Sequence, residues 1–144
     1  QIVDAALHAP SAMGRQTWEF TVVENKDKIR RLAAAMGEAL GNPSYNMYDP
    51  QVLIIPSNKR DSLYGKEDNA CAMENIFLAA WSLGIGSVWI NQLRDVCDVP
   101  QVRKILDEFQ IPSDHVVYGL AALGYSDETP LAPKERIGKT RYIK

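Results

Sequence analysis

Hydrophobic side chains along the chain fall into alternating helix-like and strand-like segments. Residues 27–40 and 68–83 repeat apolar positions at helical spacing, and the second segment becomes apolar on nearly all sides toward its end. The second helix is therefore expected at the centre of the fold. A third helix is predicted to begin at Pro100, and residues 1–7 look like the tail of another. Short β-rich runs, typical of strands, cover residues 19–24, 52–55 and 87–90, and a long β-rich stretch covers residues 115–125.

The interleaving of these segments predicts a layered α/β (α+β) domain. The connections between strands from residue 52 to residue 125 each hold a helix, so some parallel pairing, and hence a mixed sheet, is expected. Residues 57–65 are polar and are predicted to face solvent, as is His115. The segment from Ser126 onward is polar and rich in proline before a basic end.

Length and charge narrow the function classes. A chain of 144 residues is expected to form a single domain over residues 1–144. A net charge of −2 argues against a nucleic-acid or membrane-surface partner. The longest apolar run, residues 76–81, is far shorter than the about 20 residues of a membrane span. Two cysteines without a CxxC motif favour a reduced, cytoplasmic setting without a metal site.

The chain carries no recognisable catalytic motif of its own. It has no GxGxxG, no phosphate-binding lysine loop, no HExxH and no GxSxG. Neither His8 nor His115 has a neighbouring carboxylate or cysteine that spacing alone would pair with it. A chain without an evident acid or base can delegate its chemistry to a cofactor.

Three segments could hold such a cofactor. Residues 10–18 form a polar loop whose side chains and backbone groups could reach a flat, hydrogen-bonding ligand, or they are a plain connector. The glycines of residues 84–87 would let a backbone approach a ligand, or they cap a helix and start a turn. Lys139 and Arg141 could clamp a phosphate from one side of an extended strand, or they belong to a solvated basic tail.

Four stretches, in order along the chain, resemble the nitroreductase family of FMN-dependent oxidoreductases. They are APSAMGRQTWEF at 9–20, DNACAMENIFLAAWSLGIGSVWI at 68–90, the late strand at 117–124, and KTRYI at 139–143. The second stretch is the most specific. The resemblance implies a three-layer α-β-α sandwich and an intertwined homodimer, with FMN at the subunit interface touched by both chains. It also implies hydride transfer from NADH or NADPH through flavin N5 to a nitroaromatic, quinone or similar small-molecule acceptor by a ping-pong cycle.

The resemblance also assigns residues to the cofactor. The pyrimidine side of the flavin would lie against one loop, the other side against the glycine-rich turn, and the 5′-phosphate against two cations. In that order the residues are Pro10, Ser11 and Gly14 with Arg15 and Gln16 nearby; Gly84, Ile85, Gly86 and Ser87; and Lys139 and Arg141. No side chain is implied as catalytic, because the flavin carries the redox chemistry.

The sequence departs from the family pattern at two points. Many relatives have Asn where this chain has Gly14, so one side-chain hydrogen bond to the ring would be missing or replaced. The usual Arg-rich opening segment does not precede the first helix. Either the sequence lacks that part of the domain, which we expect, or the protein is a natural short form with weakened FMN binding.

Two alternative functions stay open at this level. One is a specialised flavin enzyme for reductive dehalogenation or flavin fragmentation, and the other is a flavin-free scaffold. A specialised enzyme would add substrate-recognising residues in 41–48, where Tyr45 and Tyr48 could stack on an aromatic acceptor or simply anchor the loop. Trp81 and Trp89 are predicted to lie in the core or at a subunit interface.

Overall fold

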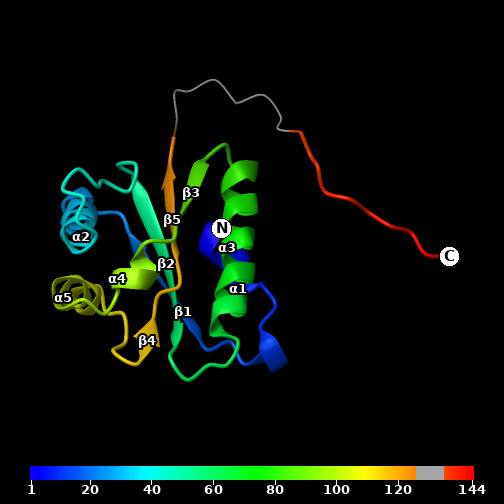
Figure 1. The fold of residues 1–144 in the computed structure, drawn as a ribbon, viewed down its shortest axis with the longest axis horizontal. Helices are drawn as coiled ribbons and strands as arrows, with labels where there is room; N and C mark the ends of the chain where they lie inside the picture. Colours follow the sequence, from blue (N-terminus) through cyan, green and yellow to red (C-terminus); the bar gives the residue numbers. More distant parts are fainter. Residues whose placement is uncertain (126–134) are drawn as a thin grey trace.

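A computed structural model describes residues 1–125 and 135–144, and the proline-rich part of the sequence at 126–134 lies outside the described residues. Five α-helices, five strands and one short 3-10 turn follow one another within residues 1–125, and Figure 1 shows their arrangement. The helices are α1 (Ile2–Leu7), α2 (Lys26–Ala39), α3 (Gly65–Ser82), α4 (Leu93–Val96) and α5 (Pro100–Glu108). The strands are β1 (Trp18–Val23), β2 (Val52–Lys59), β3 (Gly86–Ile90), β4 (His115–Val116) and β5 (Leu120–Gly124).

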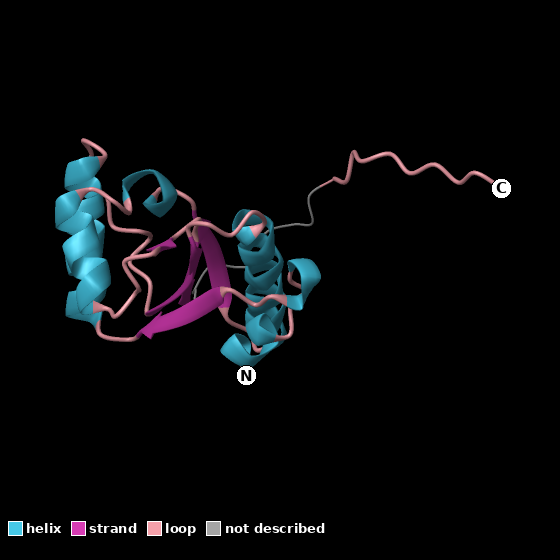
Figure 2. Cartoon of the chain, turned by 90° about the horizontal axis from the view of Figure 1, so that it is seen from below, coloured by secondary structure: helices cyan, strands magenta, loops and turns pink. Residues whose placement is uncertain are grey.

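The sheet separates two helix layers, which confirms the predicted three-layer α-β-α sandwich. Helices α1 and α3 cover one face and α2, α4 and α5 cover the other (Figures 1 and 2). Alternate side chains of β2 therefore enter different cores: Leu53 and Ile55 pack with α2 and α5, whereas Ile54 packs with α3. This is the period-two alternation of a strand that is buried on both faces.

The strand order is β1-β2-β5-β3, with β4 beside β2 at its end. Each pairing in the described residues is antiparallel, so the prediction of a mixed sheet was wrong. A connection that holds a helix permits parallel pairing but does not require it. Here β2 lies between two strands that run opposite to it, and a strand remote in sequence, β5, separates it from β3.

Local sequence signals explain where the helices begin and end. The side chain of Asn25 accepts the N–H of Lys28 at 3.0 Å and so caps the start of α2. Pro100 occupies the first turn of α5, where its missing N–H has no cost. Gly84, with a φ of 71°, ends α3 in the left-handed conformation that glycine adopts readily.

Three polar residues that were expected to face solvent are buried instead. Ser57 and Asn58 are fully buried because β2 runs to Lys59, beyond its predicted end. His115 is 2% exposed, and its Nδ1 lies 2.9 Å from the Ser57 hydroxyl, with which it forms a hydrogen bond. These side chains are tolerated in the interior because they have hydrogen-bond partners.

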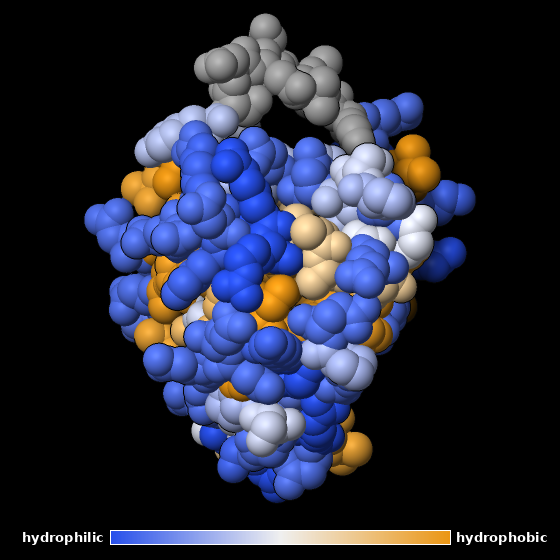
Figure 3. All heavy atoms as spheres, turned by 90° about the vertical axis from the view of Figure 1, so that its left-hand side faces the viewer, coloured by the Kyte–Doolittle hydropathy of each residue, from blue (hydrophilic) through white to orange (hydrophobic). Residues whose placement is uncertain are grey.

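The two outer layers differ in character. The outward face of α2 and α5 is largely hydrophilic (Figure 3). Helix α3 instead exposes Leu78 by 59% and Trp81 by 75%, and β3 exposes Trp89 by 41%. The helix therefore covers one face of the sheet rather than lying at the centre of the fold, and neither tryptophan is a core residue of this chain.

The two cysteines have different surroundings. Cys71 is exposed and Cys97 is buried, and both are free thiols. Burial raises the pKa of the Cys97 thiol, so Cys97 behaves as an apolar packing residue.

No helix among the described residues combines the length and the apolar character that crossing a bilayer needs. The cytoplasmic setting stays a prediction.

The core under α5 offers a direct test of packing. Leu106 is fully buried, so Leu106→Ala is expected to lower the free energy of unfolding by about 2–5 kcal/mol through lost burial and a residual cavity. Urea denaturation followed by circular dichroism measures the change. Leu63→Ala, at a side chain that is 78% exposed, is the matched control and should change stability by less than about 0.5 kcal/mol. Equal losses in the two variants would contradict the assigned core.

Candidate functional site

Residues 10–16 form an exposed loop before β1, at one end of the sheet. A single 3-10 turn, Ala12–Gly14, crosses its middle. Met13 and Gln16 have φ values of 54° and 47°, and Gly14 has 63°, so three of four successive residues adopt the left-handed conformation. That conformation is rare for residues other than glycine and tends to occur at sites that bind ligands.

Buried polar side chains tie this loop to its neighbours. The backbone N–H of Ala12 donates to Oδ1 of Asp68 at 2.8 Å. The Ser11 hydroxyl accepts the N–H of Gln16 at 3.1 Å, and Thr17 donates to the buried side chain of Asn58 at 2.7 Å. Neither Asp68 nor Asn58 is among the residues that the sequence pattern predicts for the site. Asn58 is a polar residue at the end of an apolar strand, whereas Asp68 stands among other polar residues at the start of α3, so no local pattern distinguished it.

The predicted cofactor residues of this loop are therefore together and accessible. Pro10, Gly14, Arg15 and Gln16 are exposed, and Ser11 is partly buried. A Cβ built on Gly14 would meet no heavy atom within 4 Å, so a ligand has room to approach its backbone.

Residues 84–87 form the link from α3 to β3. The N–H of Gly84 donates to the carbonyl of Trp81 at 3.0 Å, and that of Ile85 donates to Ala80 at 2.9 Å. These two bonds make a Schellman motif, so neither N–H is free for a ligand. Gly86 lies against Gly124 of β5, whose carbonyl oxygen would be 3.1 Å from an added Cβ. Close strand pairing therefore accounts for this glycine.

The two predicted contact segments lie at opposite ends of the sheet. Trp18, just after the loop, pairs with Asn58 at the far end of β2, whereas Gly86 pairs with Gly124 at the other end of the sheet. Helix α3 runs between the two ends over 18 residues, a length of about 27 Å (Figure 1). One chain does not bring the loop at 10–16 and the turn at 84–87 together.

The predicted phosphate-binding cations lie outside the folded body. Residues 135–144 form an extended segment without helix or strand that leads away from the sandwich (Figure 1). Lys139 and Arg141 are exposed, and their apolar neighbours Ile137, Tyr142 and Ile143 are 85–96% exposed. This chain places neither cation beside the loop at 10–16.

The two tyrosines that were considered for substrate contact have different surroundings. The pKa of the Tyr45 hydroxyl is raised, mainly by burial and to a smaller extent by the nearby Tyr48, and this hydroxyl donates to Gln92 Oε1 at 3.4 Å. Tyr48 is 74% exposed and lies in a left-handed run with Met47 and Asp49. The buried Met47 side chain anchors this run, so Tyr48 points outward from a fixed support.

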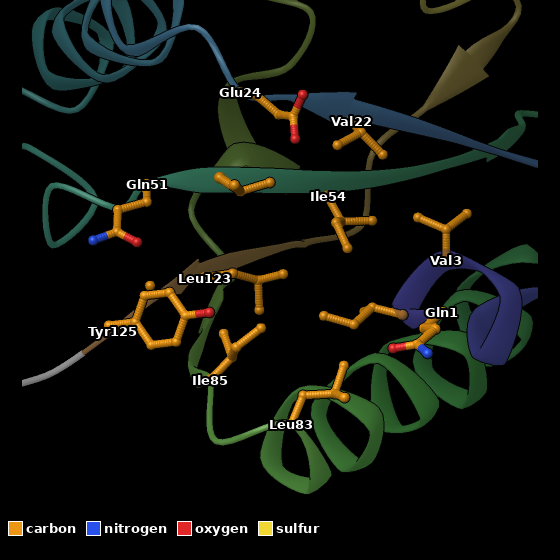
Figure 4. Close-up of a pocket in the computed structure, with 13 residues that line it drawn as sticks. Gln1, Val3, Val22, Glu24, Gln51, Ile54, Leu83, Ile85, Leu123 and Tyr125 are labelled. Atoms are coloured by element: carbon orange, nitrogen blue, oxygen red, sulfur yellow. The ribbon is translucent and has the colours of Figure 1, made fainter.

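An apolar cavity of about 410 Å³ opens beside the turn at 84–87. Side chains of the sheet, of the start of α1 and of the end of α3 surround it, and Figure 4 shows Leu83, Ile85 and Leu123 on neighbouring parts of its lining. Glu24, Gln51 and Tyr125 stand at its border (Figure 4). Of the predicted cofactor residues, Ile85 alone lines this cavity within the described part of the chain.

Residues 1–125 and 135–144 contain no evident metal-binding site. No group of three or more His, Cys, Asp or Glu side chains there is placed to hold a metal ion.

The fold and the sequence match known proteins closely. The model of the nitroreductase family matches residues 1–125. A crystal structure of a nitroreductase with bound FMN from Bacteroides fragilis is 38% identical with a TM-score of 0.87, over 99% of this chain and 84% of that one. An Archaeoglobus fulgidus protein named for NADH dehydrogenase and NAD(P)H nitroreductase is 33% identical over 87% of this chain and 70% of its own length. A Staphylococcus haemolyticus NADPH-dependent oxidoreductase is 38% identical over 95% of this chain.

These matches define a three-layer α+β protein of the nitroreductase fold. The chain belongs to the nitroreductase family. It spans 59% of the length of the S. haemolyticus relative and 70% of the A. fulgidus one.

Proposed function

We propose that this chain is an FMN-dependent oxidoreductase. It would pass hydride from NADH or NADPH to a nitroaromatic, quinone or similar small-molecule acceptor in a ping-pong cycle. The observation that carries the proposal is the close likeness to the B. fragilis nitroreductase with bound FMN, over 99% of the chain. FMN supplies the acceptance and donation of hydride, and the protein supplies position and electrostatics.

The residues of the first predicted contact segment suit a flat, hydrogen-bonding ligand. The loop at 10–16 offers exposed polar side chains, among them Arg15 and Gln16, and an open approach to the Gly14 backbone. The turn at 84–87 gives a second open approach at Gly84, where an added Cβ would also meet nothing within 4 Å. Lys139 and Arg141 are the cations proposed for the 5′-phosphate.

A homodimer would bring these segments to one ligand. A two-fold axis perpendicular to α3 would pack this helix antiparallel to its copy, so the loop at 10–16 of one chain would approach the turn at 84–87 of the other. Leu78, Trp81 and Trp89 provide an apolar surface for such packing. The extended segment 135–144, with its exposed Ile137 and Tyr142, supports an intertwined arrangement in which it reaches across to the second chain.

Tyr48 and Tyr45 are proposed to contribute differently to the acceptor site. Tyr48 offers an exposed ring for stacking on an aromatic acceptor. Tyr45, bonded to Gln92, would support the loop from beneath.

Reconstitution and turnover test the proposal. Purified protein incubated with FMN and desalted should be yellow and should oxidise NADH or NADPH when a quinone or a nitroaromatic is supplied. Initial rates at several acceptor concentrations should give parallel double-reciprocal lines, as a ping-pong cycle requires. A protein that stays colourless after incubation would overturn the FMN assignment. Bound flavin without turnover of either acceptor class would overturn the general oxidoreductase activity.

A further inference from the structure

One buried carboxylate joins the loop at 10–16 to α3. Asp68 lies in the first turn of that helix and is 5% exposed. Its Oδ1 accepts the N–H of Ala12 at 2.8 Å, a contact between residues 56 positions apart. A hydrogen bond to an ionised acceptor is stronger than one between neutral groups, so this contact is a firm attachment point.

The first turn of α3 does not itself require Asp68. A carboxylate near a helix N-terminus is stabilised by the helix dipole, and the exposed Glu67 next to it already provides one. Asp68 differs from Glu67 because it is buried against the loop. Burial of a charged group is unfavourable unless hydrogen bonds compensate, so the carboxylate and the Ala12 N–H stabilise each other.

The loop in turn needs such an attachment. Met13 and Gln16 are held in the left-handed conformation, which persists for residues other than glycine only where the surroundings impose it. The contact of Asp68 with Ala12 lies immediately before Met13, and the contact of Ser11 with Gln16 closes the other side of the turn. The other hydrogen bonds of the turn, from Gly14 to Ser11 and from Arg15 to Ala12, lie within the loop itself, so Asp68 is the contact that ties Ala12 to α3. Loss of that contact would favour relaxation of the turn toward ordinary backbone conformations.

We infer that Asp68 is a positioning residue that holds residues 11–16 in the conformation that binds the flavin. The inference rests on the proposed function, in which this loop meets the pyrimidine side of FMN. A protein whose binding-competent conformation is only partly populated binds with an affinity reduced by that fraction. Asp68 therefore sets FMN affinity without touching the cofactor.

Two measurements on Asp68→Ala test the inference. In flavin-free protein, amide hydrogen exchange at Ala12 should quicken by about tenfold or more, because the acceptor of its N–H is gone. In a titration followed by flavin fluorescence, the Kd for FMN should rise by about tenfold or more. Asp68→Asn retains an acceptor oxygen and should restore both values to within about threefold of the original. Glu67→Ala removes the same charge from the same helix turn and should leave both unchanged.

The outcomes separate this inference from the proposed function. A folded Asp68→Ala protein with unchanged exchange and unchanged Kd for FMN would overturn the positioning role. An original protein that binds no FMN would overturn the proposed function, and with it the role of Asp68 in flavin affinity.

A second variant covers failure of Asp68→Ala to fold. Ala12→Pro removes the donor instead of the acceptor, and the extended backbone of Ser11, with φ −129° and ψ 149°, suits a residue before proline. Weakened FMN binding by this variant would support the inference, and unchanged binding would contradict it.

Discussion

Replacing both Lys139 and Arg141 with alanine is expected to weaken FMN binding by at least about 100-fold. Two charge-assisted hydrogen bonds to a phosphate would be lost, each contributing about 1.5 kcal/mol or more. Because the segment 135–144 is extended and exposed, the substitutions should leave the sandwich itself intact. Titration of apoprotein with FMN, followed by fluorescence, gives the affinity, and thermal unfolding of the apoprotein checks the fold.

A control for net charge is available on α2. Lys26→Ala combined with Arg30→Ala also removes one lysine and one arginine. Both lie at exposed positions of α2, which covers the face of the sheet away from α3. FMN affinity should be unchanged in this variant. If the two double variants lose the same affinity, the effect is a general one of charge, and the assignment of the C-terminal segment to the phosphate is wrong.

The second large effect is expected from Trp81→Asp. Trp81 is 75% exposed in the single chain, and an indole buried at an interface covers about 150–250 Å². A two-fold interface contains the substitution twice, once in each subunit, and dimer formation would also require desolvation of both introduced carboxylates. The dimer dissociation constant should rise by at least about 1,000-fold, as measured by analytical ultracentrifugation. Bound FMN should fall with it, since one chain does not bring both contact segments together.

Leu40→Asp is the matched control for this variant. Leu40 is 37% exposed at the end of α2, on the other side of the sheet, so it should leave association unchanged. A monomeric original protein would refute the proposed homodimer. A Trp81→Asp protein that remains dimeric with full flavin content would show that the interface lies elsewhere.

Much of the secondary structure could be predicted because its signals are local. The apolar spacing of Ile29, Leu32 and Met36 predicts α2, and these side chains are indeed buried. Gly84 was assigned to the end of α3 on its conformational freedom, and the Schellman motif confirms that role. The resemblance to the nitroreductase family could also be recognised from the sequence, because it rests on short stretches in a fixed order. The match to the family model confirms it.

Errors arose where a local pattern was ambiguous. The alternation in β2 continues past Ile55 through Pro56, Ser57 and Asn58, which look like the start of a loop. Partners from elsewhere in the chain, His115 and Thr17, make burial of Ser57 and Asn58 possible. The positions of His115 and Thr17 depend on how the strands pair, and the local sequence around residue 57 does not reveal that pairing.

By itself, the sequence determined the presence of α1, α2, α3 and α5 and of β1, β2 and β3, the glycine at the end of α3, and the family, since each depends on side chains close together along the chain. It did not predict α4, it placed the start of α3 three residues late, and it treated β4 and β5 as one strand. Tertiary structure alone decided strand direction, the pairing of Ala12 with Asp68, and the separation of the loop at 10–16 from the turn at 84–87. The loop at 10–16 contacts the first turn of α3 through the hydrogen bond of Ala12 to Asp68, and the turn at 84–87 follows the last turn of the same helix. Only the path of the chain through the sheet shows that about 27 Å of helix lies between them.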